Sequence, residues 1–165
     1  MNNSVIYFSK INPKAIFPSK HNGDAGYDIY ACFDEDRLII KPHESKLVPT
    51  GIASAFSEDY AFIFYERGST GTKNIKVNAG VIDASFRGEW FVCLYNANDI
   101  PLIITKRIDE YNDKSKNRLI YPYSKAIAQA LLIPVPKVHI NNIDYKKLKE
   151  FTSERGTGML GSTNK

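Results

Sequence analysis

Asp83 is the acid in residues 77–88, which read VNAGVIDASFRG. A carboxylate at the tip of a turn can take a proton from a water molecule that attacks a substrate. Val77, Ala79 and Val81 alternate with their neighbours, so the stretch predicts a β-hairpin with the acid at its tip. Taken alone, Asp83 is better explained as a turn residue that hydrogen-bonds its own backbone. The catalytic interpretation depends on other segments.

Residues 66–74 read ERGSTGTKN and combine glycines and hydroxyl side chains with Arg67. Such a segment, leaving a strand and opening a short helical turn, can present several backbone N–H groups to one anion. The guanidinium of Arg67 adds a forked donor that fits phosphate oxygens. The spacing does not match a Walker A motif, so an ordinary polar loop remains the alternative.

Asp28 lies in residues 25–31, AGYDIYA, where aromatic and apolar residues predict a strand. A charge inside a strand of this kind is usually paired with another charge or solvated at a site. Asp28 is therefore a candidate site residue, like Asp83, but it lies in a different predicted strand.

The C-terminal residues 153–165 read SERGTGMLGSTNK and are rich in glycine and hydroxyl side chains. They have too little apolar content to fold alone, so a disordered terminus is one interpretation. The other is an arm that orders over a ligand, for which Arg155 would be suited. We expect one domain over residues 1–152 and an arm over residues 153–165.

Many short strands must position these segments, and they predict the fold class. Strands are expected over residues 5–9, 25–31, 38–40, 46–48, 51–56, 61–65, 90–95, 102–105 and 127–135. Residues 90–95 are apolar on both faces and predict a buried central strand. Residues 106–117 predict an exposed excursion, and Asp144 is expected to cap a short helix that reaches Leu148. Little helical periodicity then favours a single-domain, all-β sandwich or barrel.

Composition sets limits on the class of protein. The chain has 165 residues, 43% of them hydrophobic, which suits one domain. No apolar run is long enough to span a membrane, and the N-terminus lacks the layout of a signal peptide, so we expect a cytoplasmic protein. Cys32 and Cys93 are expected to be buried free thiols. The net charge of +4 is mild, and no nucleic-acid-binding signature accompanies it, so we expect no nucleic-acid or membrane partner.

Taken together, five segments resemble the five motifs of the trimeric dUTPases, the dUTP pyrophosphatases. The matching segments are AGYDIYA (25–31), ERGST (66–70), GVIDASFRG (80–88), AIAQ (126–129) and RGTGMLGST (155–163). Each match alone is weak, but five in order across nearly the whole chain are specific. The resemblance implies a jelly-roll-like β-fold, a homotrimer with active sites at subunit interfaces, and Mg²⁺-dependent hydrolysis of dUTP to dUMP and pyrophosphate. The chain would work in the cytoplasm of a cell, or of a host if it comes from a phage or virus.

The resemblance also implies a role for individual residues. Asp83 would activate the water that attacks the α-phosphorus, and Phe86 would pack under the deoxyribose and exclude a 2′-hydroxyl. The backbone near Gly80, Val81 and Ile82 would read uracil, because a stiff strand can exclude the methyl group of thymine better than a soft pocket.

Phosphate binding and metal binding fall on the other motifs. The implied phosphate contacts are Arg67, Gly68, Ser69, Gln129, Arg155, Gly161 and Ser162. Gly156 is a further implied substrate contact, and Leu160 would cap the base. Donors on the phosphates stabilise charge in the transition state. Mg²⁺ binds mostly through substrate phosphates and keeps several waters, so Asp28 would act on it through water. Gln129 would orient water or a phosphate, although a polar residue at a strand edge explains it nearly as well.

Four positions depart from the motifs of the family. Gly68 stands where a serine is usual, so the role of Ser69 is less certain than that of Arg67. Phe86 replaces a tyrosine and keeps only the steric platform. Ala126 replaces an arginine, whose contact is missing or supplied elsewhere. Leu160 replaces an aromatic residue that stacks on uracil. The excursion at residues 106–121 is also longer than the usual turn.

Two rival functions follow from these departures. A dCTP deaminase of the same fold needs a glutamate in the strand after the hairpin, but that position is Cys93, which argues against deamination. A catalytically weakened homologue that regulates by binding nucleotide or a protein partner is the other rival. Retention of Asp83, Asp28 and Gln129 argues against it, because a pure binder has no need of a water-activating acid.

Overall fold

The computed structural model describes residues 5–111, 117–154 and 156–158. The chain divides into two compact units, Met1–Val135 and Pro136–Lys165. The first unit contains all of the strands that the structure describes, so the prediction of an all-β fold is confirmed. The division falls earlier than residue 153, and the role of an arm over residues 153–165 stays a prediction.

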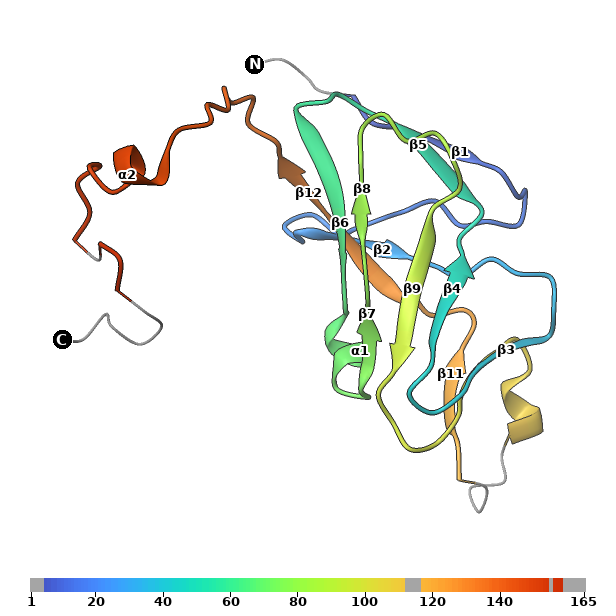
Figure 1. Cartoon of the computed structure of the whole chain (residues 1–165). Coiled ribbons are helices and arrows are strands. Elements are labelled where there is room, and N and C mark those ends of the chain that lie inside the picture. Colours follow the sequence, from blue (N-terminus) through green and yellow to red (C-terminus); the bar gives the residue numbers. More distant parts are fainter. Residues whose placement is uncertain (1–4, 112–116, 155, 159–165) are drawn as a thin grey trace. The chain divides into compact units, whose positions relative to one another are not determined.

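Four small sheets make up the first unit (Figure 1). The first sheet contains four strands, which lie side by side in the order β2 (Gly26–Ile29), β12 (Ala128–Pro134), β6 (Tyr60–Tyr65) and β8 (Val81–Ile82). The second contains β4 (Ser45–Pro49), β9 (Phe91–Asn96) and β7 (Ile75–Val77). The third contains β11 (Leu119–Pro122), β10 (Leu102–Thr105) and β3 (Arg37–Ile40), and the fourth contains β1 (Tyr7–Lys10) and β5 (Ile52–Ala55). The short helix α1 (Gly68–Gly71) and the 3₁₀ helix η1 (Ile108–Tyr111) complete the unit.

Phe62 and Trp90 lie at the centre of the hydrophobic core, and both are fully buried. Their ring centroids are 5.1 Å apart, and Phe56 and Phe8 pack edge-on against them. Aromatic pairs at such spacings add stability beyond the area that they bury. Phe62 on β6 pairs with Ile82, which directly precedes Asp83, and Trp90 lies just before β9. The core therefore anchors the chain on both sides of Asp83.

The predicted hairpin is wrong in its pairing. β7 and β9 do pair with one another, but β8, the strand directly before Asp83, pairs with β6 in another sheet, so residues 77–82 do not form one strand of a hairpin with Asp83 at its tip. Ala79 lies between β7 and β8 with a φ of 53°, a left-handed conformation that breaks the strand. The turn after Asp83 is present, but within the connection from β7 to β9.

Two other strand predictions need correction. β9 is a central strand, as expected, but only alternate side chains are buried; Phe91 is 41% exposed, so the strand is not buried on both faces. The excursion after Thr105 contains η1 and ends in β11, which was not predicted and pairs in parallel with β10. Cys32 is a buried free thiol and Cys93 a half-buried one, and burial raises the pKa of the Cys32 thiol.

The second unit contains the helix α2 (Tyr145–Leu148), which begins after Asp144. The helix lies where it was predicted, but the side chain of Asp144 makes no capping hydrogen bond, so the predicted cause is wrong. Within the described part of this unit every side chain is exposed, including Val138 and Ile140. None of the helices described is long and apolar enough to cross a membrane.

Candidate active site

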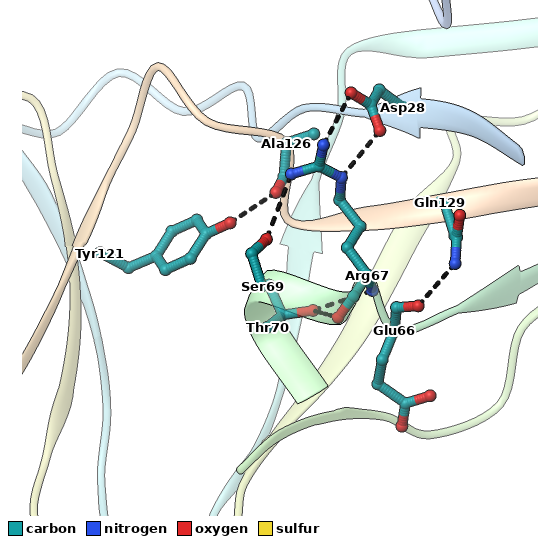
Figure 2. A network of polar contacts seen from close by, with 8 residues as sticks. All are labelled: Asp28, Glu66, Arg67, Ser69, Thr70, Tyr121, Ala126 and Gln129. Atoms are coloured by element: carbon teal, nitrogen blue, oxygen red, sulfur yellow. Dashed lines mark hydrogen bonds and ion pairs between the residues drawn. The ribbon is translucent and has the colours of Figure 1, made fainter. Parts of the chain in front are cut away.

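The first sheet brings three of the expected site residues to one of its ends. Gln129 on β12 pairs with Asp28 on β2 and, on its other side, with Tyr65 at the end of β6. Arg67 follows two residues after Tyr65. Antiparallel register therefore gathers side chains that are far apart in sequence, and we call Asp28, Arg67, Ser69 and Gln129 the sheet-end cluster (Figure 2).

Arg67 and Asp28 form a two-point ion pair within the sheet-end cluster (Figure 2). The Nε of Arg67 donates to Oδ1 of Asp28 at 2.8 Å, and Nη2 donates to Oδ2 at 3.1 Å. The remaining Nη1 donates to the hydroxyl of Ser69 at 3.3 Å. Both charged side chains are about a third exposed, so they are reachable by a ligand. Of the two alternatives expected for Asp28, a paired or a solvated charge, the structure shows the paired one, and the partner is the arginine of the second motif.

The helical turn α1 holds the backbone at Arg67 in place. The backbone N–H of Arg67 donates to the hydroxyl of Thr70, and the same hydroxyl donates to the carbonyl of Arg67, both at 3.0 Å. Thr70 is buried, whereas Gly68 and Ser69 are exposed. The predicted short helical turn is therefore present and exposes its first residues. Phosphate binding by Arg67, Gly68 and Ser69 stays a prediction.

Gln129 is fixed from two directions. Its side-chain amide Nε2 donates to the carbonyl of Glu66 at 2.7 Å (Figure 2). A Cβ added at Gly26 would lie 2.5 Å from its Oε1, so only glycine at that position leaves room for the amide. The carboxylate of Glu66 in turn accepts from the N–H of Val77 at 3.1 Å. Gly26 and Glu66 were not assigned from sequence, because both roles depend on contacts across strands.

Asp83 lies at the start of an exposed turn bracketed by two buried residues, Ile82 and Trp90. The N–H of Phe86 donates to the carbonyl of Asp83 at 3.1 Å, which closes residues 83–86 into what we call the Asp83 turn. Asp83 is exposed, and the ring of Phe86 is 43% exposed. An acid and an aromatic ring are therefore presented together to solvent on a rigidly anchored segment.

The backbone of β8 is accessible along one edge. The N–H of Phe64 on β6 donates to the carbonyl of Gly80 at 2.8 Å, and a Cβ added at Gly80 would lie 2.8 Å from that of Phe64. Hydrogen-bonded and non-hydrogen-bonded pairs alternate along antiparallel strands, so the N–H and C=O of Val81 point away from β6. Among the described residues no strand pairs with this outer edge. It offers a donor and an acceptor, which uracil recognition would require.

The sheet-end cluster and the Asp83 turn lie at opposite ends of β6. Ile82 pairs with Phe62, so Asp83 comes opposite Ala61 at the start of β6, whereas Arg67 follows the end of that strand. From Ala61 to Arg67 the extended chain covers about 20 Å, at about 3.3 Å per residue. Figure 1 shows α1 at one end of β6 and the chain after β8 at the other. One copy of the chain therefore cannot place Asp83 and Arg67 on the same reacting group.

Ala126, where the resemblance leads us to expect an arginine, is buried. The hydroxyl of Tyr121 on β11 donates to the carbonyl of Ala126 at 2.7 Å (Figure 2), and Tyr121 is only 3% exposed. The end of the long excursion thus holds the segment that leads into β12 and Gln129. The sequence placed Tyr121 in the excursion without a role, because β11 itself was not predicted.

We expect Tyr121→Phe to lower the free energy of unfolding by about 1–3 kcal/mol, because the buried carbonyl of Ala126 loses its donor without a water to replace it. Urea denaturation followed by tryptophan fluorescence measures the change. Tyr7→Phe is the matched control, since Tyr7 is 65% exposed, and we expect it to change stability by less than about 0.5 kcal/mol. Equal effects of the two substitutions would contradict a structural role for the Tyr121 hydroxyl.

Some expected residues cannot be placed. Arg155, Leu160, Gly161 and Ser162 lie outside the described residues, and Gly156 is exposed in the second unit. Among the described residues no group of three or more His, Cys, Asp or Glu could hold a metal ion. The carboxylate of Asp28 keeps lone pairs beyond the two that Arg67 uses, so it fits a Mg²⁺ ion held through water and substrate phosphates.

Comparison with known proteins identifies the family. A family model described as dUTPase matches residues 12–109. The deoxyuridine 5′-triphosphate nucleotidohydrolase of Neisseria meningitidis serogroup A is 32% identical over 146 residues, 86% of this chain and 82% of that protein. The corresponding protein of Leptospira interrogans is 37% identical over 103 residues, 60% of this chain and 70% of that protein.

A solved structure supports the fold. It is a variant dUTPase of Staphylococcus bacteriophage 80alpha with dUpNHpp, which covers 96% of this chain and 97% of its own, with a TM-score of 0.73 and 21% identity. The predicted jelly-roll-like β-fold is thereby confirmed. On the family model and the relatives together, this chain belongs to the dUTPase family.

Proposed function

We propose that this chain hydrolyses dUTP to dUMP and pyrophosphate in a Mg²⁺-dependent reaction, at sites formed between copies in a homotrimer. The observation that carries the proposal is the placement of two complementary half-sites at opposite ends of β6. One half presents an acid beside an aromatic ring, and the other presents an arginine, a hydroxyl and an amide. Membership of the dUTPase family points to hydrolysis of dUTP, a reaction that would use both half-sites.

Asp83 acts as the general base. Its exposed carboxylate accepts a proton from water, and the oxygen of that water forms a bond to the α-phosphorus. The bond from the α-phosphorus to the oxygen that bridges to the β-phosphate breaks, and pyrophosphate leaves. Because Ile82 and Trp90 are buried on either side, the acid starts the reaction from a fixed position rather than from a mobile loop.

The sheet-end cluster of a neighbouring copy binds the phosphates. Arg67 carries five N–H donors, of which Asp28 and Ser69 engage three, and the side chain is 30% exposed. Gly68, Ser69 and Gln129 add donors beside it. Residues 153–165, with Arg155, Gly156, Leu160, Gly161 and Ser162, close over the site from an adjacent copy.

Mg²⁺ when bound neutralises phosphate charge and orients the triphosphate. Asp28 would hold the metal through water. The ion pair with Arg67 fixes the direction of the Asp28 carboxylate, as that role requires.

Base and sugar are selected on the Asp83 side. The outward N–H and C=O of Val81, between Gly80 and Ile82, pair with uracil, and the stiffness of the paired strand leaves no space for a 5-methyl group. The ring of Phe86 packs under the deoxyribose, where a 2′-hydroxyl would collide.

A second candidate is a weakened homologue that binds nucleotide or a protein partner. One observation favours it: the forked face of Arg67 is already occupied by Asp28, so fewer donors remain for a phosphate. The buried Ala126 supplies no replacement for the expected arginine.

Release of pyrophosphate from dUTP with Mg²⁺, beside dTTP, dCTP and UTP, tests the proposal. We expect release from dUTP, with the other three slower by at least about tenfold, since a methyl or hydroxyl difference is worth at least that and the 4-amino group of cytosine leaves hydrogen-bonding groups of the site unpaired. If dUTP binds in calorimetry but no pyrophosphate is released, the enzyme proposal fails and the binding function replaces it. If release is equal from all four, the assignment of Val81 and Phe86 to selection fails.

A further inference from the structure

Arg87 and Gly88 follow the Asp83 turn and take no part in the chemistry proposed above, yet both contact the turn. The Nη1 of Arg87 donates to the carbonyl of Phe86 at 2.9 Å and also to the carbonyl of Ala84. The guanidinium is thus folded back onto its own turn. These two hydrogen bonds go to backbone oxygens inside the turn.

Gly88 lies directly against the ring of Phe86. A Cβ added at position 88 would lie 2.6 Å from Cζ and 2.9 Å from Cε2 of that ring. Non-bonded carbons prefer separations of about 3.5–4.0 Å, so the ring and a methyl group cannot both keep their places. The obstructed atoms are the far end of an exposed side chain, so the ring would swing away while the backbone stays.

These contacts act on the turn from two directions. Arg87 ties the carbonyls of Ala84 and Phe86 to one cationic group, which fixes the direction in which the backbone presents Phe86. Gly88 provides the bare backbone surface on which the ring rests. The orientation of the Phe86 ring is therefore set by Arg87 and Gly88, the two residues that follow it. In the proposed function this ring is the group that contacts the deoxyribose.

We propose that Arg87 and Gly88 are positioning residues that hold the Phe86 ring where it distinguishes deoxyribose from ribose. The inference rests on the proposed function, in which Phe86 is the sugar platform. It predicts that selectivity for the sugar depends on residues that never touch it, and that their effect passes through the ring alone.

Gly88→Ala tests the inference through binding as well as turnover. Calorimetry gives the ratio of affinities for dUMP and UMP, and initial rates give the ratio of kcat/KM for dUTP and UTP. We expect both ratios to fall about tenfold or more, because a displacement near 1 Å at a site can cost up to about a hundredfold. The urea midpoint should stay unchanged, since the ring can move into solvent.

A double-mutant cycle separates positioning from general damage. In a Phe86→Ala background the ring is gone, so adding Gly88→Ala should change the two ratios by less than about twofold. If Gly88→Ala lowers selectivity equally in both backgrounds, its effect does not pass through Phe86 and the inference is overturned. Unchanged selectivity of the single variant overturns it as well.

Arg87→Met and Arg87→Lys test the other contact. Methionine keeps the length of the side chain but has no donor, whereas lysine can still donate to two carbonyls. We expect methionine to lower the selectivity ratios about tenfold and lysine to restore most of the loss. Equal behaviour of the two variants would overturn the role of Arg87.

Failure of the proposed enzyme function can be distinguished from failure of this inference. If the unchanged chain binds dUMP more tightly than UMP but does not hydrolyse dUTP, the enzyme function is contradicted, whereas the ratios of binding affinities still test the inference.

Discussion

Asp83→Asn is expected to lower kcat for dUTP by about 10²–10⁴-fold, the usual contribution of a general base. Asparagine keeps the size and the turn chemistry of aspartate but cannot accept the proton of the attacking water. Affinity for a non-hydrolysable dUTP analogue should stay within a few-fold, because the ring of Phe86 and the backbone of Val81 are unaltered. Initial rates of pyrophosphate release and calorimetry with the analogue measure the two effects.

Asp99→Asn is the matched control for the change in charge. Its side chain is 96% exposed and forms an exposed pair with His43, which contributes little. We expect kcat and analogue affinity to equal those of the unchanged chain. Turnover of Asp83→Asn within tenfold of the unchanged chain would remove Asp83 as the base and would turn attention to another acid, Asp28.

The strands of the first unit were predictable where the chain alternates or runs apolar next to turn residues. Residues 61–65 and 127–135 were recognised in this way, and they became β6 and β12, the central pair of the first sheet. β11 was missed because a four-residue strand has little periodicity of its own and is stabilised by parallel pairing with β10. Such pairing depends on tertiary context, which local pattern does not contain.

The predicted hairpin failed for a related reason. Residues 77–82 alternate as one strand would, but Ala79 adopts a positive φ and the chain changes sheets between Val77 and Val81. Alanine carries no sequence signal for that conformation, unlike glycine or asparagine. The turn itself was recognised because Asp83 and the small residues after it are typical of turns.

In the candidate site, residue types were predictable from sequence and partnerships were not. Arg67 and Asp28 were both recognised as site residues from the chemistry of their segments, but nothing in sequence said that they bind one another. Their pairing follows from the register of β12 with β2 and β6, which places residues 28, 65 and 129 in one row. The space at Gly26 depends on register in the same way.

The geometry of β6 makes a second prediction with a large effect, which is complementation between two inactive variants. Arg67→Met removes the donors of the sheet-end cluster and should cost about 10²–10³-fold in kcat. Asp83→Asn removes the base. If each site takes Asp83 from one copy and Arg67 from another, mixed assemblies contain some sites in which both residues are intact.

Co-expression of the two variants with different affinity tags, followed by purification through both tags, yields mixed assemblies. Purification through both tags removes the assemblies that contain one variant only, and every mixed trimer has one interface at which both intact residues meet, so about a third of the sites should be complete. We therefore expect activity that is far above that of either variant alone and near a third of that of the unchanged chain. Each variant assembled only with itself is the control.

Absence of recovery in assemblies that carry both tags would mean that Asp83 and Arg67 serve the same site from one copy, or that one of them serves no site. The first alternative conflicts with the separation of about 20 Å along β6, at about 3.3 Å per residue. It would require the Asp83 turn to leave its anchors, although Ile82 and Trp90 are buried on either side of it. Recovery near a third instead means that the half-sites at the two ends of one sheet are completed by another copy of the chain, so that the chain can act only as an oligomer.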